Sequence, residues 1–298
     1  MWKKVSVRWT KFYWNSYFKI LKLFNSDKLL FLYWYNKTQN FGDTINPLFI
    51  SIISQKKIVW MNPVLGSVPY IHAIGSIIEF NAPNSIIWGS GFISEDSDLR
   101  ATPLAIKAVR GPKSRQRFLD YGLECPEVYG DPALLFPRVY FPKIEKKYRL
   151  GIMPHYVEKQ SLWLQNIIKS HKDIKIIDVQ EEDVWKVIDD MLSCDKIASS
   201  SLHGLIVADA YGIPSSWISF SDKLHGGTFK FFDYFLSVGR ADTEALKINE
   251  STTIKEIESS FYDYKIDIDL EKLIEAAPFK VSFPENIEAR PSIVEGSI

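Results

Sequence analysis

The sequence has little cysteine and no excess of either charge. Its two cysteines, Cys125 and Cys194, stand far apart among 298 residues and form no CxxC pair, so we expect buried free thiols in a reducing cytoplasm. The 36 Lys and Arg residues equal the 36 Asp and Glu residues. This balance argues against a nucleic-acid-binding protein, which normally carries a basic excess. HExxH and Walker motifs are absent, and we predict no metal site.

Long hydrophobic runs are also absent. The apolar stretch from Leu29 to Tyr35 is far shorter than the roughly 20 residues of a membrane-spanning helix, and no secretory signal is visible at the start. We therefore expect a soluble or peripheral protein. The first 28 residues nevertheless hold seven basic residues, one acid and many aromatics. This pattern is typical either of a helix on an anionic membrane, with contact through residues 1–24, or of an amphipathic helix packed on its own domain.

The remaining sequence has enough apolar material for two cores, with 46% hydrophobic residues. Short apolar segments alternate with helical segments of about ten residues, most regularly after residue 150, as in βαβ units with parallel sheets. We predict an α/β protein with two Rossmann-like domains facing a cleft. The predicted parts are the basic aromatic segment 1–28, an N-terminal domain 29–145, a C-terminal domain 146–277 and an irregular tail 278–298. We also expect a loop over 37–46 and a helix from about Pro47, since proline suits a first helical turn.

The most informative segment is DKIASSSLHGLIVADAYGIPSSW, residues 195–217, which predicts a strand, a serine turn, a helix and a further strand. His203 stands where the turn becomes the helix, at the carboxyl edge where α/β sheets bind ligands. The helix start offers free N–H groups and a positive dipole end. Together with the hydroxyls of Ser199, Ser200 and Ser201, it predicts an anion site with an acid–base group beside it.

Cations stand at two other predicted helix starts, where they oppose the helix dipole. Arg110 ends a strand before the helix opened by Pro112, and Lys113 lies in the first turn of that helix. Lys230 opens a later helix. Since stability explains these positions poorly, they indicate recognition of an anion. His155 follows the first strand of the second half and is either structural or a second acid–base group.

Four more polar positions lie at predicted strand ends or helix starts. NFGDTIN, with Asn40 and Asp43, is either a substrate-binding loop or only a helix cap formed by Asp43 or Thr44, and Ser90 in WGSGF marks either a tight turn or a close approach to a ligand. Asp131 in YGDPALLF is either a ligand carboxylate or part of an Asp-Pro turn. His225, in a glycine-bearing loop, is a further residue expected at the edge of the cleft.

Taken in order, NFGDTIN, WGSGF, VRGPKS, YGDPALL and SSSLHGLIVADAYGIP followed by KFFDY resemble the polysaccharide pyruvyl transferase family over roughly residues 29–239. The resemblance implies a GT-B-like arrangement of the two domains. It also implies an enzyme that moves pyruvate from phosphoenolpyruvate onto two hydroxyls of one sugar, giving a ketal and phosphate without a cofactor. Ser201, Leu202 and His203 match the family's SLH or RLH motif, in which some members have arginine at the position of Ser201.

Under this resemblance, His203 is expected to be the general acid–base residue and His155 the second candidate. The donor would be bound by Arg110, Lys113, Ser199, Ser200, Ser201 and Lys230, and the acceptor by Asn40, Asp43, Ser90, Asp131 and His225. The acceptor is expected to be a lipid-linked sugar of a capsular or exopolysaccharide precursor, at the cytoplasmic face of the inner membrane. Two alternatives stay open: a GT-B glycosyltransferase that uses a nucleotide sugar, and a catalytically silent glycan-binding protein.

Overall fold

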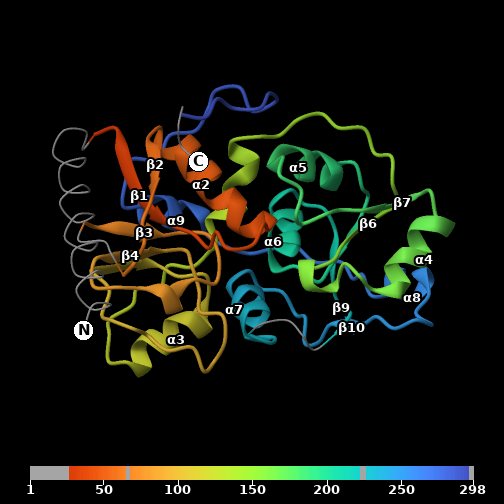
Figure 1. Ribbon diagram of the computed structural model, residues 1–298, viewed down its shortest axis with the longest axis horizontal. Helices are drawn as coiled ribbons and strands as arrows, with labels where there is room; N and C mark the ends of the chain where they lie inside the picture. The colour runs from red at the N-terminus through yellow and green to blue at the C-terminus, as the bar shows by residue number, and fades with distance from the viewer. Residues whose placement is uncertain (1–26, 65–67, 222–225, 295–298) are drawn as a thin grey trace, which may run out of the picture.

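The computed structural model describes residues 27–64, 68–221 and 226–294 (Figure 1). The predicted membrane-contacting segment 1–24 and His225 lie outside the described residues. None of the helices within the described ranges is long and apolar enough to cross a bilayer. Both cysteines are buried free thiols, which confirms the prediction for their side chains.

The first half is built on a parallel sheet of five strands in the order β2-β1-β3-β4-β5 (Figure 1). Its β-branched and aromatic residues favour extended backbone. The register pairs Leu32 of β1 with Trp60 of β2 and with Ile71 of β3. The strands are β1 (Leu29–Tyr33), β2 (Lys57–Trp60), β3 (Tyr70–His72), β4 (Ser85–Trp88) and β5 (Ala105–Ala108).

The second half holds another parallel sheet, ordered β10-β9-β8-β6-β7. Counted within each half, both sheets have the doubly wound order 2-1-3-4-5, so two Rossmann-like sheets are present as predicted. In this order the ligand crevice lies beyond the carboxyl ends of the first and third strands, here β1 and β3, and β6 and β8. The strands are β6 (Leu150–Met153), β7 (Ile174–Ile176), β8 (Ile197–Ser199), β9 (Ser215–Ser219) and β10 (Leu246–Lys247).

Helices and short 3₁₀ turns connect and cover these strands (Figure 1). Residues 112–122 follow the prediction, with Pro112 first in its helix and Gly122 beyond the end at φ 71°. The α-helices are α2 (Phe41–Ser54), α3 (Pro112–Asp120), α4 (Leu162–Ser170), α5 (Val184–Leu192), α6 (Leu202–Ala210), α7 (Phe229–Ser237), α8 (Ile254–Ser259) and α9 (Leu270–Glu275). The 3₁₀ turns are η1 (Ile78–Phe80), η2 (Pro132–Arg138) and η3 (Tyr156–Glu158).

The predicted helix start near Pro47 was wrong. Helix α2 begins six residues earlier, at Phe41, and Asn40 is its N-cap, so NFGDTIN forms the start of a helix and not a loop. The backbone N–H of Phe41 donates to the carbonyl of Val179 in the second half at 2.6 Å. This bond supplies one of the partners that the first turn of a helix lacks, and it fixes the start of α2 against the other half.

One hydrophobic core runs through both halves. The largest cluster of buried side chains includes Phe49 and Trp88 of the first half and Met153, Trp185 and Ile206 of the second. Helix α2 packs against α5 and α6, and η2 packs against α6. The two halves therefore meet through close-packed apolar contacts, which fix their relative position.

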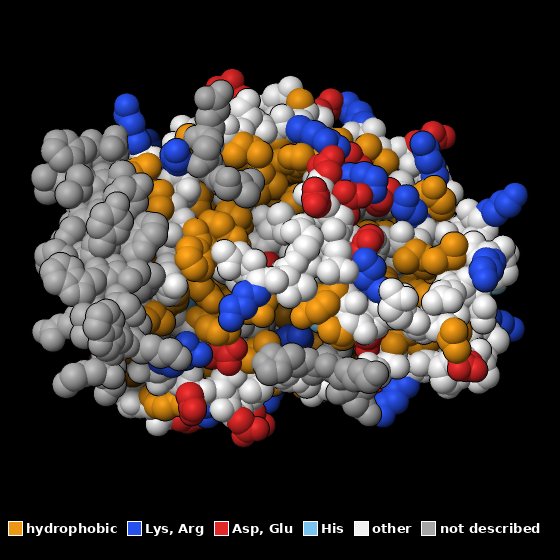
Figure 2. All heavy atoms as spheres, viewed as in Figure 1, with side chains coloured by type: hydrophobic (Ala, Val, Ile, Leu, Met, Phe, Trp, Pro, Cys, Tyr) orange, Lys and Arg blue, Asp and Glu red, His pale blue; other side chains and the backbone are white. Residues whose placement is uncertain are grey.

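The C-terminal part of the chain returns to the first half, where α9 lies near the first sheet (Figure 1). Trp88 Nε1 donates to the carbonyl of Leu273 at 2.8 Å. Further along, Arg290 pairs with Asp183 at 3.0 Å and Asp189 at 3.1 Å beside α5. Figure 2 shows acidic and basic side chains gathered together over α5, and both signs are mixed across this face, as expected for a chain without net charge.

Candidate functional site

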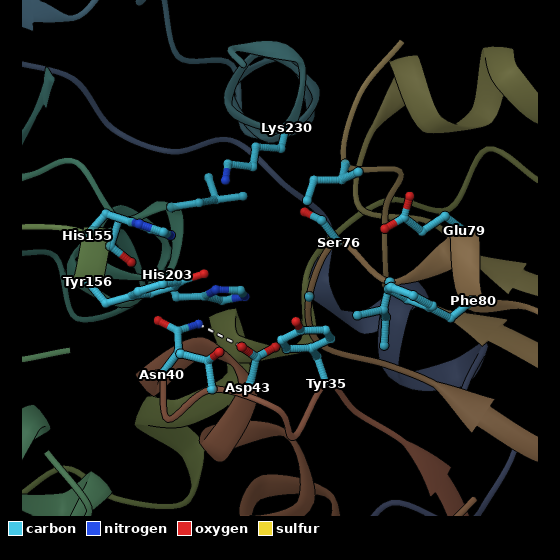
Figure 3. A pocket seen from close by; sticks show the side chains of 16 residues that line it. Tyr35, Asn40, Asp43, Ser76, Glu79, Phe80, His155, Tyr156, His203 and Lys230 are labelled. Atoms are coloured by element: carbon cyan, nitrogen blue, oxygen red, sulfur yellow. Dashed lines mark hydrogen bonds between the residues drawn. The ribbon is translucent and has the colours of Figure 1, made fainter. Parts of the chain in front are cut away.

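A pocket of about 300 Å³ opens between the two halves (Figure 3). Most of its walls come from the loops that leave the carboxyl ends of the first and third strands of both sheets, where this strand order places a ligand crevice, and Ile93 after β4 also contributes. Lys230 reaches it from the start of α7, and Asp43 from the first turn of α2. The strand-end residues are Tyr35, Thr38 and Asn40 after β1, Gly75, Ser76 and Ile77 after β3, His155 and Tyr156 after β6, and Ser201, Leu202 and His203 after β8.

His203 is the second residue of α6, and its imidazole lies against the start of α2. A Cβ placed on Gly42 would come within 2.0 Å of His203 Nδ1. Glycine is required there for space, since residue 42 lies within a helix and needs no special backbone conformation. The side chain of His203 keeps 11% of its surface exposed and lines the pocket. The structure thus brings two helix starts, α2 and α6, together around one imidazole.

The other ring nitrogen of His203 faces Asp131. The distance from His203 Nε2 to Asp131 Oδ2 is 3.5 Å, and the Asp131 side chain is fully buried. Asp131 Oδ1 accepts from the backbone N–H of Ala133 at 3.0 Å and so caps η2. Asp131 therefore contacts His203, the predicted acid–base residue, but does not itself line the described pocket.

Burial is the main cause of the shifted pKa values of Asp43, His155, Tyr156 and Lys230, which all line the pocket. Burial raises the pKa of Asp43 to about 6, although the hydrogen bond from Asn40 Nδ2 (2.8 Å) and the charges of His203 and Lys230 oppose the shift. Burial and the charge of Arg110 together lower the pKa of Lys230 to about 8, although Asp43 and Glu158 oppose the shift. At neutral pH the pocket therefore holds a mainly ionised carboxylate and a mainly charged ammonium.

His155 has a different protonation state from the one a general acid needs. Burial lowers its pKa to about 4, and the charge of Lys230 acts in the same direction. The ring is neutral at pH 7, and its Nδ1 accepts weakly from the backbone N–H of Val157 at 3.5 Å. His155 can accept a hydrogen bond or a proton in this pocket, but it cannot contribute a positive charge at neutral pH.

The three hydroxyls of the serine turn have different surroundings. Ser199 Oγ donates to a β6 carbonyl at 3.0 Å, and Ser200 Oγ donates to the buried carboxylate of Glu158 at 2.5 Å. Ser200 Oγ also accepts from the backbone N–H of His155 at 2.9 Å. Neither of these two serines lines the described pocket, whereas Ser201 does, and its side chain makes no capping bond to α6. Ser199 and Ser200 shape the turn, and Ser201 faces the space beside His203.

Arg110 is buried behind the wall of the pocket. Its Nε donates to Asp233 Oδ2 of α7 at 3.0 Å, and its two terminal nitrogens donate to Ser76 Oγ (2.5 Å) and the Phe92 carbonyl (2.7 Å). The guanidinium is fully buried and belongs to none of the residues lining the described pocket. Arg110 thus connects Ser76, which lines the pocket from the first half, to helix α7, which carries Lys230.

Two other predicted residues also lie away from the described pocket. Lys113 Nζ lies 5.5 Å from the ring centre of Phe229, at the start of α7. Ser90 is fully buried, and its Oγ has no hydrogen-bond partner among the described residues. His225 lies outside the described residues. The structure therefore brings together, in one pocket, Asn40, Asp43, His155, Ser201, His203 and Lys230.

Sequence comparison agrees with the motifs. The sequence model of the family described as polysaccharide pyruvyl transferase matches residues 2–222. The chain belongs to this family. It is 30% identical over 220 residues to the uncharacterized protein L143 of Acanthamoeba polyphaga mimivirus, which covers 71% of this chain and 75% of that protein. It is 26% identical over 221 residues to the succinoglycan biosynthesis protein ExoV of Rhizobium meliloti (strain 1021), which covers 70% of this chain and 64% of ExoV.

Several residues that line the pocket were not predicted from the sequence. Tyr35 lies two residues beyond β1 and Ser76 four beyond β3, so the rule that ligands bind at strand ends would have found both. Glu79 and Phe80 belong to the 3₁₀ turn η1 and carry no motif signal. Outside the pocket lining, Glu158 of the 3₁₀ turn η3 accepts a hydrogen bond from Ser200, and it shows no local pattern that predicts its burial.

Proposed function

We propose that this chain transfers a pyruvyl group from phosphoenolpyruvate to two hydroxyls of one sugar in a polysaccharide precursor, with His203 as the general acid–base residue. One observation carries the proposal: a histidine, a buried lysine, a carboxylate and the start of helix α6 converge in one small pocket. Such a set suits a small anionic donor that must be protonated during the reaction. Membership of the pyruvyl transferase family supports the same reaction class.

The second half supplies the donor side in this proposal. The ammonium of Lys230 and the free N–H groups at the start of α6, beside Ser201, bind the phosphate and carboxylate of phosphoenolpyruvate. Lys230 provides the positive charge that an arginine at position 201 would otherwise add. Arg110 acts from behind the wall by holding Asp233 and Ser76 in place, and Ser199 and Ser200 act by shaping the turn.

The first half supplies the acceptor side. The rings of Tyr35 and Phe80 have centroids 6.1 Å apart and both line the pocket, and such aromatic faces suit the apolar face of a sugar ring. Asn40, Asp43 and Glu79 provide polar groups for its hydroxyls (Figure 3). Two sheets of the same strand order around one pocket also support a GT-B-like arrangement of the halves.

The proposed chemistry begins when the methylene carbon of phosphoenolpyruvate gains a proton, which leaves positive charge on C2. One sugar hydroxyl oxygen bonds to C2 and loses its proton. The bond from C2 to the phosphate oxygen then breaks, and the second hydroxyl oxygen bonds to C2 as its proton leaves. One hydroxyl proton ends on the new methyl group and the other on the released phosphate. His203 moves these protons, and the Asp43 carboxylate stabilises the cationic carbon.

His203 suits this role better than His155 does. A general acid must carry a proton near the working pH, and the lowered pKa of His155, about 4, leaves that ring neutral. His203 also lies between the two helix starts, within reach of groups bound on either side of the pocket. We therefore assign proton transfer to His203 and hydrogen bonding to His155.

We also propose that the acceptor is carried on a lipid at the cytoplasmic face of the membrane, as part of a capsular or exopolysaccharide unit. Residues 1–24 would then contact the membrane through their basic and aromatic side chains. Deletion of residues 1–24 tests this idea. The shortened chain should leave the membrane fraction while keeping its activity on a soluble acceptor, and unchanged fractionation would contradict membrane contact.

Thermal shift separates this function from the alternatives. Phosphoenolpyruvate should raise the unfolding temperature of the protein, whereas nucleoside diphosphates and nucleotide sugars should not. The reason is that only a ligand that binds the native state stabilises the native state. A panel of galactosides, mannosides and glucosides, each tested for phosphate release from phosphoenolpyruvate, would then identify the acceptor. Stabilisation by a nucleotide alone would indicate a glycosyltransferase. Binding of glycans without any phosphate release would indicate a silent glycan-binding protein.

A further inference from the structure

Asp131 is a fully buried carboxylate whose two oxygens have different surroundings. Oδ1 accepts the backbone N–H of Ala133 at 3.0 Å, which anchors the carboxylate at the start of η2. Oδ2 points at His203 Nε2, 3.5 Å away. Because η2 packs against α6, the element that holds the carboxylate and the helix that carries the imidazole are in direct contact.

Within the part of the chain that the structure describes, neither of the facing atoms has another partner. Asp131 Oδ2 and His203 Nε2 are both sealed from solvent, and neither makes a hydrogen bond within the described residues. A buried polar atom left without a partner costs roughly 1–3 kcal/mol, and more when it is charged. An N–H donor on His203 Nε2 would satisfy both atoms at once. Catalytic hydrogen bonds are often long in the unliganded enzyme and shorten when substrate binds.

The exposed part of the His203 side chain lies away from Nε2. The side chain of His203 keeps 11% exposure, and the sealed Nε2 contributes essentially none of it. Nδ1 lies beside α2, in the space that a Cβ on Gly42 would fill. Nε2 of His203 therefore faces the Asp131 carboxylate, and Nδ1 faces the start of α2, which forms part of the pocket wall.

We propose that Asp131 is a positioning residue that accepts the Nε2–H of His203 and thereby fixes the tautomer with a free lone pair on Nδ1. Nδ1 is then the atom that takes up and releases the protons of the reaction, while Nε2 keeps its own proton throughout. When Nδ1 is protonated, the Asp131 carboxylate stabilises the resulting imidazolium. The catalytic part of this inference rests on the proposed function, whereas the tautomer itself does not.

Asp131→Asn separates positioning from simple capping. The amide oxygen can still accept from Ala133 and cap η2, but the amide nitrogen then faces His203 Nε2 as a donor. That arrangement favours the opposite tautomer, with the proton on Nδ1. A purely structural Asp131 predicts no such change.

The experiment is long-range ¹⁵N–¹H NMR of histidine-labelled protein without substrate at pH 8, where histidines are ordinarily neutral. The His203 signals are identified by their loss in His203→Gln. We expect the Nε2–H tautomer in the wild type and in the control Asp96→Asn, an exposed acid, and the Nδ1–H tautomer in Asp131→Asn. An Nδ1–H tautomer in the wild type, or no change in Asp131→Asn, would overturn the proposal. The wild-type spectrum alone decides the matter if that variant does not fold.

Kinetics complete the test. In Asp131→Asn, kcat for phosphate release should fall on the order of 10²-fold or more, while KM for phosphoenolpyruvate stays near its wild-type value. An unchanged kcat despite the altered tautomer would contradict the catalytic role. Failure of the proposed function would be distinguishable from both results, because the wild type would then release no phosphate at all while its tautomer could still be read.

Discussion

Gly42 packs so closely against the imidazole of His203 that a side chain at position 42 would overlap the ring. A Cβ on Gly42 would lie 2.0 Å from His203 Nδ1 and 2.7 Å from Cε1 and Cγ. The two residues belong to opposite halves of the chain, so this contact links the start of α2 to the start of α6. The position of the imidazole therefore depends on the absence of a side chain in the other half.

Gly42→Ala should displace the imidazole and lower kcat on the order of 10²-fold, since small misplacements of a catalytic group have effects of that size. Alanine is more favourable than glycine within a helix by about 1 kcal/mol. The substitution should therefore not weaken helix α2 itself. Rates of phosphate release and thermal unfolding of the same preparations measure both effects. The control Gly122→Ala, at φ 71° with open space around it, should lose stability and keep its rate. A wild-type rate in Gly42→Ala would contradict this account of the site.

Lys230 predicts a particular pH dependence of donor binding. Its lowered pKa of about 8 means that the ammonium loses its charge as pH rises through 8, so KM for phosphoenolpyruvate should increase above that pH. Lys230→Met should show a high KM that lacks this rise. Steady-state kinetics from pH 6.5 to 9.5 would measure it, with the exposed Lys107→Met as the control. The same rise in Lys230→Met would assign the titration to another group.

Asp43 should make the protein less stable in its ionised form. Its pKa of about 6 in the folded state lies above the ordinary value of 3.8, so the native state binds a proton more tightly than the unfolded state. The stabilising contribution of the protonated form is full below about pH 4 and is lost as pH rises through 6.

Asp43→Asn should therefore raise the free energy of unfolding at pH 7.5 by on the order of 1 kcal/mol, and the gain should vanish near pH 4. Its kcat should fall, because the carboxylate no longer stabilises the cationic carbon. Urea unfolding at several pH values tests the first part, with the exposed Asp96→Asn as the control. An advantage that persists unchanged at pH 4 would show that ionisation of Asp43 is not its source.

The Arg110–Asp233 pair should be a strong structural link between the halves. Both side chains are fully buried, and Asp233 also accepts from the backbone N–H (2.8 Å) and hydroxyl (2.6 Å) of Ser114. Asp233→Leu leaves a buried guanidinium without its carboxylate partner, and the loss of one partner of a buried ion pair typically costs 3–5 kcal/mol. The exposed pair Arg138–Glu271 provides the control, and Glu271→Gln should cost less than about 1 kcal/mol. Equal losses in urea unfolding would contradict the assigned roles.

Much of the fold could be predicted because its signals are local. The strands and helices from β6 to α7 follow apolar segments of the expected length, and helix α3 begins at its proline, whereas β10, α8 and α9 were not predicted. The start of α2 could not be predicted in this way. Gly42 and Asp43 suggest a loop, but Gly42 is explained by an imidazole some 160 residues away in the sequence, and local propensity carries no such information.

The same limit applies to the site. The SLH segment placed Ser201 and His203 correctly at a helix start beside a pocket. Arg110 was expected to bind a ligand because it stands before a helix start, yet its partner Asp233 lies 123 residues further along the chain. A pairing of that kind depends on how the two sheets meet, which the alternation of strands and helices does not specify.

The central claim is that His203 carries the protons of pyruvyl transfer from phosphoenolpyruvate. The most direct measurement compares acceptor-dependent phosphate release by the wild type, His203→Gln and His155→Gln. The wild type should release phosphate only when a suitable sugar is present, His155→Gln should keep most of that rate, and His203→Gln should lose on the order of 10²-fold or more. Full turnover by His203→Gln would contradict the claim.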